Sequence, residues 1–276
     1  MKNIAVICCA VLTFAFVGRA AFAEDAKLKT TAKAALAKYQ DAVVTVKLVV
    51  KSRTLADGKE VNKSERPVEI TGTVLTPTGL TVISESSIDE MSLSAGEFVA
   101  LSPSGEAVDA GSVKTERETS RVKLLFTNGR EIPGKFVLRD KDLDLAFILP
   151  GEKCADMAHI ALEKGPVPGV LDDLIVLSRL SKSLNHAPAV SLHPVSAVLK
   201  KPRTYLVPDM YDPLKFGCPV FSASGQPVGI TVSRRSPKAT KNLADMLDDS
   251  PDIVVLTAAD IHQAASQIAK LSKATK

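Results

Sequence analysis

Along most of the chain the hydrophobic residues fall into short apolar and β-branched runs, with Gly, Pro, Asn or Asp between the runs. Such runs are typical of β-strands, and the Asn128-Gly129 pair between two of them is a strong hairpin signal. The pattern predicts two sets of strands on either side of the proline- and glycine-rich segment 163–170. The first set is 42–51, 69–76, 81–84, 122–127, 131–138 and 145–149, and the second is 174–177, 189–199, 204–207, 220–222, 228–233 and 253–256. Two sets of six strands predict an all-β fold built from a pair of antiparallel β-barrels.

The two ends of the chain follow a helical period instead. Near the amino end, apolar residues lie on one helical face at Leu28, Ala32, Ala35, Leu36 and Tyr39. Near the carboxyl end, Thr257 and Asp260 resemble a capping box that opens a second helix. That helix continues with apolar residues at Ile261, Ala265, Ile268 and Leu271. Short terminal helices are therefore expected to flank the β-barrels.

The first residues have the pattern of a cleavable secretory signal. Lys2 precedes an apolar run at 4–17, and small residues at Ala21 and Ala23 mark a cleavage site. We therefore expect a signal peptide at 1–23 and a secreted or periplasmic mature chain. In that chain, 24–162 would hold the amino-terminal helix and first barrel, and 163–276 the second barrel and carboxyl-terminal helix. No apolar stretch reaches the roughly 20 residues of a membrane span, so no span is expected.

Charge and cysteine content narrow the classes of function. The formal net charge of +4 over 276 residues gives no basis for nucleic-acid binding, and we expect no nucleic-acid partner. Cys8 and Cys9 lie in the signal, which leaves Cys154 and Cys218. Two cysteines are too few for a zinc site, and neither a metal nor another cofactor is predicted. A disulfide between Cys154 and Cys218 and two free thiols both remain open, because the sequence gives no distance between them.

Three segments, taken in order, resemble the trypsin-like serine proteases of the Deg or HtrA type. The first is "ITGTVLTPTGLTVISESSI", Ile70 to Ile88. It is similar to that family's strand, Gly-x-x-x-x-Pro-x-Gly turn and histidine-bearing loop, with Gly72, Pro77 and Gly79 on the pattern. Ser86 falls where the family has its catalytic histidine.

The second segment, "VKLLFTNGREIPGKFVLRDKDLDLAFI" at 122–148, is similar to a hairpin followed by the acid-bearing strand, with Asp144 on the catalytic aspartate. The third, "KFGCPVFSASGQPVGITV" at 215–232, resembles the Asn-Ser-Gly-Gly-Pro nucleophile loop and the hairpin after it. This alignment places Phe216 on the nucleophilic serine. The resemblance covers most of the mature chain and implies a trypsin-like double β-barrel. No segment resembling a PDZ domain is recognised after it.

The same alignment implies changes in the loop that forms the oxyanion hole. Gly217 and Cys218 fall on the two glycines that precede the family's proline. Leu214 replaces the glycine whose backbone N–H helps to form the oxyanion hole. The resemblance therefore implies that the loop, with Phe216 in place of the nucleophile, has also lost part of its glycine-dependent geometry at Leu214 and Cys218.

Each position of a catalytic triad has a chemical role, and the aligned residue must be able to perform it. The hydroxyl of Ser86 is far too weakly basic to take a proton near neutral pH. Phe216 has no atom that attacks a carbonyl carbon. Asp144 is able to orient a histidine, but the alignment supplies none. The resemblance therefore implies an inactive homologue, a pseudoprotease in which Asp144 has a structural role.

Other nucleophiles and bases are weaker candidates. The four histidines, His159, His186, His193 and His262, all lie outside the expected histidine loop and are interpreted as surface or satisfied polar residues. Cys218 has no histidine placed to form its thiolate, and a structural cysteine is the preferred interpretation. An active serine endopeptidase would need a displaced nucleophile, for which the candidates are Ser84, Ser86, Ser87 and Ser222.

We therefore expect an exported, catalytically inactive protease homologue. Its cleft and exposed strand edges would bind extended peptide or a protein partner, since such edges pair with an incoming strand. Two alternatives from other classes remain: an active serine endopeptidase with a displaced nucleophile, and a structural envelope protein.

Overall fold

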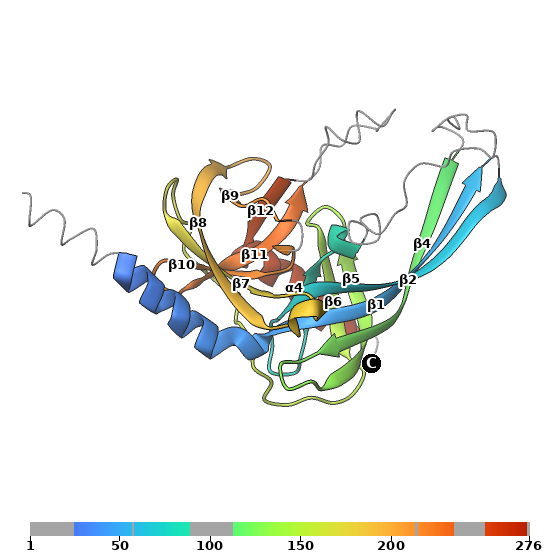
Figure 1. Ribbon diagram of the computed structural model, residues 1–276, viewed down its shortest axis with the longest axis horizontal. Helices are drawn as coiled ribbons and strands as arrows, with labels where there is room; N and C mark the ends of the chain where they lie inside the picture. The colour runs from blue at the N-terminus through green and yellow to red at the C-terminus, as the bar shows by residue number, and fades with distance from the viewer. Residues whose placement is uncertain (1–24, 57, 89–112, 213–214, 235–251, 275–276) are drawn as a thin grey trace, which may run out of the picture.

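The computed structural model describes residues 25–56, 58–88, 113–212, 215–234 and 252–274 (Figure 1). The signal-like segment 1–23 lies outside these residues. The strands form two closed antiparallel barrels, as predicted. The first barrel has the order β1 (Val43–Ala56), β2 (Lys59–Val74), β3 (Thr81–Ser84), β6 (Leu145–Pro150), β5 (Glu131–Asp140) and β4 (Val113–Leu125). The second has the order β10 (Pro219–Ser222), β11 (Pro227–Arg234), β12 (Asp252–Thr257), β9 (Tyr205–Pro208), β8 (Pro188–Leu199) and β7 (Asp173–Arg179).

Three strands of the first barrel are much longer than their apolar runs predicted. The predicted strand 42–51 runs to Ala56 in β1, 69–76 starts at Lys59 in β2, and 122–127 starts at Val113 in β4. Most of the added residues are polar, and in β2 they are mostly exposed, so no regular core-facing alternation marks them. They pair with one another in a three-stranded arm that leaves the barrel body (Figure 1). Backbone pairing, which the hydrophobic pattern does not report, extends these strands.

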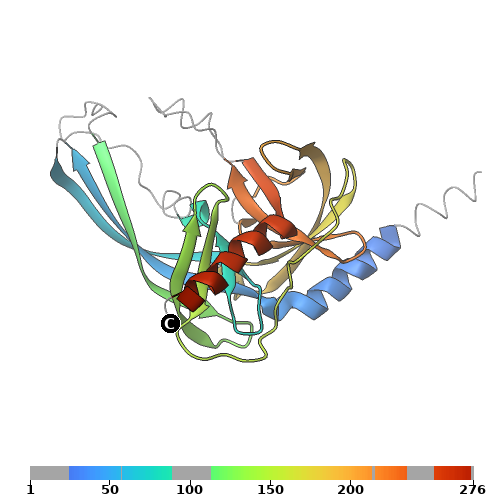
Figure 2. The same cartoon turned by 180° about the vertical axis from the view of Figure 1, so that it is seen from behind.

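The terminal helices cover the barrels from outside, as Figure 2 shows. In the amino-terminal helix, residues 25–39, the ring of Tyr39 stacks on Phe221 of β10 with the ring centroids 5.0 Å apart. Short 3-10 turns follow at η1 (Gln40–Ala42) and, between β7 and β8, at η2 (Lys182–Leu184). The carboxyl-terminal helix α4 (Ala258–Ala274) buries Ile261 in the same core. The predicted cap is present, since the hydroxyl of Thr257 donates to Asp260 Oδ2 at 2.6 Å. The side chain of Leu271 lies outside the described residues.

The two cysteines are not bridged, which overturns the disulfide alternative. Cys218 is fully buried in the core of the second barrel, whereas the partly exposed Cys154 lies after β6, with its Sγ 3.6 Å from the carbonyl oxygen of Glu152. The hydrophobic core of a domain of this size does not depend on a disulfide.

A buried guanidinium joins the two barrels. Arg179, at the end of β7, is 9% exposed and donates to the carbonyl oxygens of Val43 at 2.8 Å and Gln40 at 2.9 Å. It also donates to His186 O at 3.1 Å and to the hydroxyl of Thr127. Burial lowers the pKa of Arg179, and the charge of Asp41 opposes that shift. One side chain of the second barrel therefore satisfies backbone acceptors at the start of the first.

Replacing Arg179 with Met should lower the free energy of unfolding by about 2–4 kcal/mol, because buried carbonyls lose their donors at roughly 1–3 kcal/mol each. Urea denaturation measures the change. The matched control is Arg130→Met, which removes an exposed ion pair with Glu152 and should cost no more than about 0.5 kcal/mol. Equal effects of the two substitutions would show that Arg179 does not hold the barrels together.

Candidate functional site

The carboxylate of Asp144 lies at the interface between the barrels. Asp144 occupies the turn before β6, has a φ of 55° and is 8% exposed. Its Oδ2 accepts hydrogen bonds from the hydroxyl of Ser84 and from the backbone N–H of Ser233, the latter at 2.8 Å. Because Ser84 ends β3 and Ser233 belongs to β11, this one oxygen binds both barrels.

Ser86, at the position of the family's histidine, binds the other oxygen of the same carboxylate. Its backbone N–H donates to Asp144 Oδ1 at 2.7 Å and its hydroxyl donates at 2.6 Å. The carboxylate thus has four donors among the described residues. Burial nevertheless raises the pKa of Asp144 above its ordinary value, and these hydrogen bonds oppose that rise. The site keeps an acid and its hydrogen-bond donors but has no base at this position.

The loop that carries Phe216 packs against the first barrel. Phe216 is 1% exposed, and its neighbour Gly217 has a φ of +74°. A Cβ at Gly217 would lie 2.4 Å from the carbonyl oxygen of Thr71. The carbonyl oxygen of Gly217 accepts a hydrogen bond from the hydroxyl of Thr73 at 2.9 Å. Only glycine fits this close approach of two backbones. Of the two positions that the resemblance aligns with glycines, 217 and 218, only the first holds a glycine. Leu214 lies outside the described residues.

Cys218, at the other glycine position, is inert. Its backbone N–H donates to the hydroxyl of Thr231 at 2.9 Å, and its side chain is fully buried. Burial raises the pKa of its thiol to about 12. A nucleophilic thiolate at neutral pH is excluded by that value.

The segments that carry Ser86, Asp144 and Phe216 lie at the interface between the barrels. Ser86 and Asp144 are in direct contact. Phe216 adjoins Gly217, where an added Cβ would lie 3.4 Å from the backbone nitrogen of Ser84. Three segments far apart in the sequence thus lie together at this interface, and their alignment with the triad stays a prediction.

A pocket of about 400 Å³ opens beside these residues, between β1 and β2 on one side and the β7–β8 turn on the other. Ser87 and Phe216 connect it to the triad-equivalent positions. Its remaining lining residues are Thr45, Glu69, Ile70, Thr71, Ser178, Arg179, Leu180, Ser181, Lys182, Ser183, Leu184, His186, Asp212 and Lys215. The volume is typical of a ligand site.

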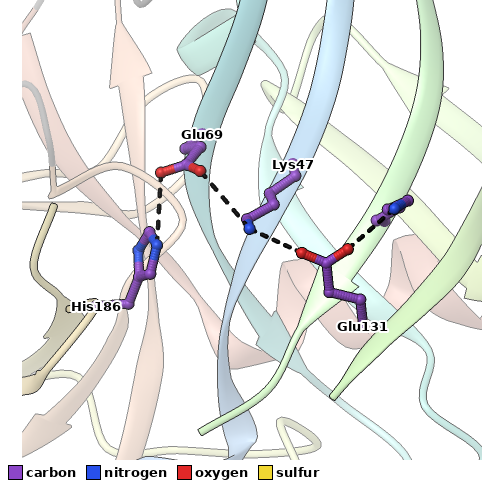
Figure 3. A network of polar contacts seen from close by, with 5 residues as sticks. Lys47, Glu69, Glu131 and His186 are labelled. Atoms are coloured by element: carbon purple, nitrogen blue, oxygen red, sulfur yellow. Dashed lines mark hydrogen bonds and ion pairs between the residues drawn. The ribbon is translucent and has the colours of Figure 1, made fainter. Parts of the chain in front are cut away.

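A chain of charged groups runs from this pocket across the first barrel (Figure 3). His186 Nε2 lies 3.7 Å from Glu69 Oε2, and the other oxygen of Glu69 lies 3.9 Å from Lys47 Nζ. Lys47 donates to Glu131 at 2.8 Å, and Lys123 donates to the same carboxylate at 2.9 Å. The hydrogen bonds from Lys47 and Lys123 lower the pKa of Glu131 to about 2. The strand register places these side chains side by side and fixes Glu69 at the pocket wall.

The serines considered as displaced nucleophiles are engaged elsewhere. The hydroxyls of Ser84 and Ser86 bind Asp144, Ser87 donates to the carbonyl oxygen of Ser84 at 2.6 Å, and Ser222 is paired with Ser224. In the part of the chain that the structure describes, no group of three His, Cys, Asp or Glu side chains is arranged to hold a metal ion.

Among the histidines, His159 and His193 are satisfied by backbone carbonyl oxygens, and His262 is exposed on α4. His186 differs, because it lines the pocket next to Glu69. Sequence reasoning missed His186 and Arg179 as pocket residues. Arg179 ends β7, and His186 lies in the turn between β7 and β8. The only sequence signal for this part of the pocket was an arginine directly after the apolar run of β7.

Comparison with known proteins rests on structure alone. No protein-family model matches the chain, and no curated protein matches its sequence. The MamO protease domain from Magnetospirillum magneticum, in its apo form, is 20% identical over 81% of this chain and 95% of that chain, with a TM-score of 0.47. The serine endoprotease from Yersinia pestis is 12% identical over 86% of this chain and 66% of that chain, with a TM-score of 0.51. The HtrA-type protease AlgW with a decapeptide is 10% identical over 81% of this chain and 62% of that chain, with a TM-score of 0.50.

The chain thus spans somewhat less than two thirds of the length of the latter two proteins. At these identities the likeness shows the fold alone, and the fold is the trypsin-like double barrel of HtrA-type serine proteases. The predicted fold is confirmed. None of the described helices has both the length and the apolar character that crossing a bilayer requires.

The raised pKa of Asp144 makes a prediction about stability and pH. Because the folded-state pKa lies above the unfolded one, the protonated carboxyl favours folding below the unfolded pKa, and this contribution is lost as the pH rises through the folded pKa. The free energy of unfolding of the wild type, relative to that of Asp144→Asn, should therefore fall as the pH rises from the unfolded-state pKa to the folded-state pKa of Asp144. Urea denaturation at a series of pH values tests it, with carboxyl carbon NMR reporting the titration of Asp144 directly. A relative stability that rises with pH would contradict the prediction.

Proposed function

We propose that this chain is an exported, catalytically inactive homologue of trypsin-like serine proteases that binds an extended peptide segment of a partner in the pocket between its barrels. The observation that carries the proposal is the position of the pocket. It opens at Phe216 and Ser87, directly beside the residues aligned with the triad. The inactive site and the binding site are therefore adjacent, and the pocket is accessible without any catalytic group.

Loss of catalysis is supported by what occupies the triad positions. A buried aromatic ring stands in place of the nucleophile, and a serine that donates both its N–H and O–H to Asp144 stands in place of the base. A hydroxyl is not an effective base near neutral pH, and the hydroxyl of Ser86 is already donated to Asp144. No proton transfer can therefore connect these groups.

Peptide binding is supported by the strand that lines the pocket. β2 pairs with β3 only through Thr73 and Val74, so Glu69 and Ile70 pair with β1 alone among the described strands. The edge next to the pocket is therefore open to an added strand. Apolar contacts are available at the mouth, where Leu184 is 55% exposed and Leu180 is 37% exposed. An HtrA-type protease of this fold has been solved with a decapeptide.

Export is supported by the amino-terminal pattern, a lysine followed by an apolar run and small residues. A secreted or periplasmic location follows from it, with the mature chain starting at residue 24. The division of the mature chain into 24–162 and 163–276 is kept as part of this proposal, with the boundary between β6, which ends at Pro150, and β7, which begins at Asp173.

An active serine hydrolase is the second candidate, and one observation favours it. His186 and Glu69 place an imidazole beside a carboxylate inside a pocket that also contains serines. A fluorophosphonate probe labels an activated serine, so labelling that is abolished by His186→Ala would support this candidate and overturn the proposal. A structural envelope protein, the third candidate, predicts neither labelling nor peptide binding.

Restoring the two missing triad residues should not restore peptidase activity. In Ser86→His with Phe216→Ser, the loss of the buried ring should also lower the free energy of unfolding by about 3–5 kcal/mol, as for other large-to-small core changes. Hydrolysis of casein and labelling by fluorophosphonate measure activity, and urea denaturation measures stability. Turnover well above the background of the wild type would show that a working oxyanion site has been retained.

Trimming the pocket mouth should weaken peptide binding without affecting the fold. Leu184→Ser removes an exposed leucine that lines the pocket, and Leu199→Ser removes one of similar exposure that does not. With peptides selected from a random phage-displayed library, Leu184→Ser should raise the dissociation constant by about 3- to 10-fold, since a partly buried leucine contributes on the order of 1 kcal/mol. The control should bind like the wild type. Selection of no peptide, or equal effects of both variants, would contradict the proposed function.

A further inference from the structure

Three permanently cationic side chains line the pocket. Arg179 forms its wall, Lys182 extends from the β7–β8 turn, and Lys215 precedes Phe216. The donors of Arg179 are directed to neutral acceptors, three carbonyl oxygens and one hydroxyl, and Lys215 Nζ lies 3.2 Å from the hydroxyl of Ser191. None of the three forms an ion pair with a described residue. Among the described residues, no carboxylate therefore pairs directly with any of the three, although the charge of Asp41 acts on Arg179.

Two carboxylates, those of Glu69 and Asp212, also line the pocket, and their interactions affect the net charge that a ligand meets there. Glu69 lies between Lys47 Nζ and the imidazole of His186, so the charge of Lys47 partly compensates its own. Asp212 has contacts of its own within the protein. Hydroxyl donors are abundant in the same turn, where Ser181 and Ser183 lie 2.8 Å apart. The β7–β8 turn thus combines cations and hydroxyl groups, which together are suited to a carboxylate.

We propose that the pocket recognises a carboxylate on the bound peptide, with Lys182 as the residue that selects it. The inference rests on the proposed function, because it names the chemistry of the peptide that binds there. Both an acidic side chain and a free carboxyl terminus supply this group. Lys182 is the exposed cation of the set, so its charge is the one that reaches an incoming ligand. Arg179 contributes its field from the wall while it holds the barrels together.

The test uses synthetic hexapeptide mixtures in which one position is fixed as Glu or as Gln and the others vary. Each mixture is made with a free and with an amidated carboxyl end and carries a fluorophore at its amino end. Fluorescence anisotropy at low salt should give at least about 5-fold tighter binding for mixtures with the recognised carboxylate, and the difference should shrink in 0.5 M salt. A preference that follows Glu identifies a side chain, and one that follows the free end identifies the terminus.

Substitutions assign the effect to the pocket. Lys182→Glu should remove the preference for the carboxylate and weaken acidic mixtures by about 5- to 10-fold, because it replaces attraction with repulsion. The matched control, Lys164→Glu, reverses an exposed lysine outside the pocket and should leave the preference unchanged. Equal affinity for neutral and carboxylate-bearing peptides, or equal effects of both reversals, would overturn the inference. Failure of every mixture to bind would instead overturn the proposed function.

Discussion

One buried carboxylate determines how the two barrels meet. A charge out of water is costly unless it is fully hydrogen-bonded, and Asp144 obtains donors from the end of β3, from the turn after it and from β11 of the other barrel. In the protease fold, the group at this position orients a histidine. Here Ser86 supplies a hydroxyl and a backbone N–H in its place. The buried carboxylate thereby has four donors among the described residues and forms a structural joint between the two barrels.

The contact between the barrels also explains which residue types the loop at 216–218 contains. Gly217 lies where a side chain would collide with the backbone of β2, so the contact between barrels keeps a glycine there. Phe216 and Cys218, on either side of it, are buried and contribute to packing instead of chemistry. Packing accepts apolar residues of suitable size, whereas attack on a carbonyl requires a particular atom. Apolar residues at positions 216 and 218 are therefore compatible with the conformation of this loop.

Sequence patterns predicted what local physics encodes. Alternation and turn residues located the barrel strands, the Asn128-Gly129 turn follows its signal, and three short segments brought Ser86, Asp144 and Phe216 to one interface. The arm of β1, β2 and β4 was missed because its polar strands are held by pairing with one another. The disulfide was left open because the sequence carried no distance between Cys154 and Cys218. The pocket role of Arg179 was missed because its partners at Val43 and Gln40 lie more than a hundred residues away in the chain.

The exposed β7–β8 turn lines the pocket without taking part in the joint, whereas Arg179 and Phe216 belong to both the pocket lining and the barrel interface. Asp144, Gly217 and the guanidinium of Arg179 bind groups of the protein itself, so substitutions there disturb the barrel interface before they reach any ligand. Lys182 and Leu184 have exposed side chains on the β7–β8 turn, so these side chains can change at little cost in stability. Under the proposed function, binding specificity can therefore diverge through the β7–β8 turn while the barrel interface around Asp144 stays fixed as its support.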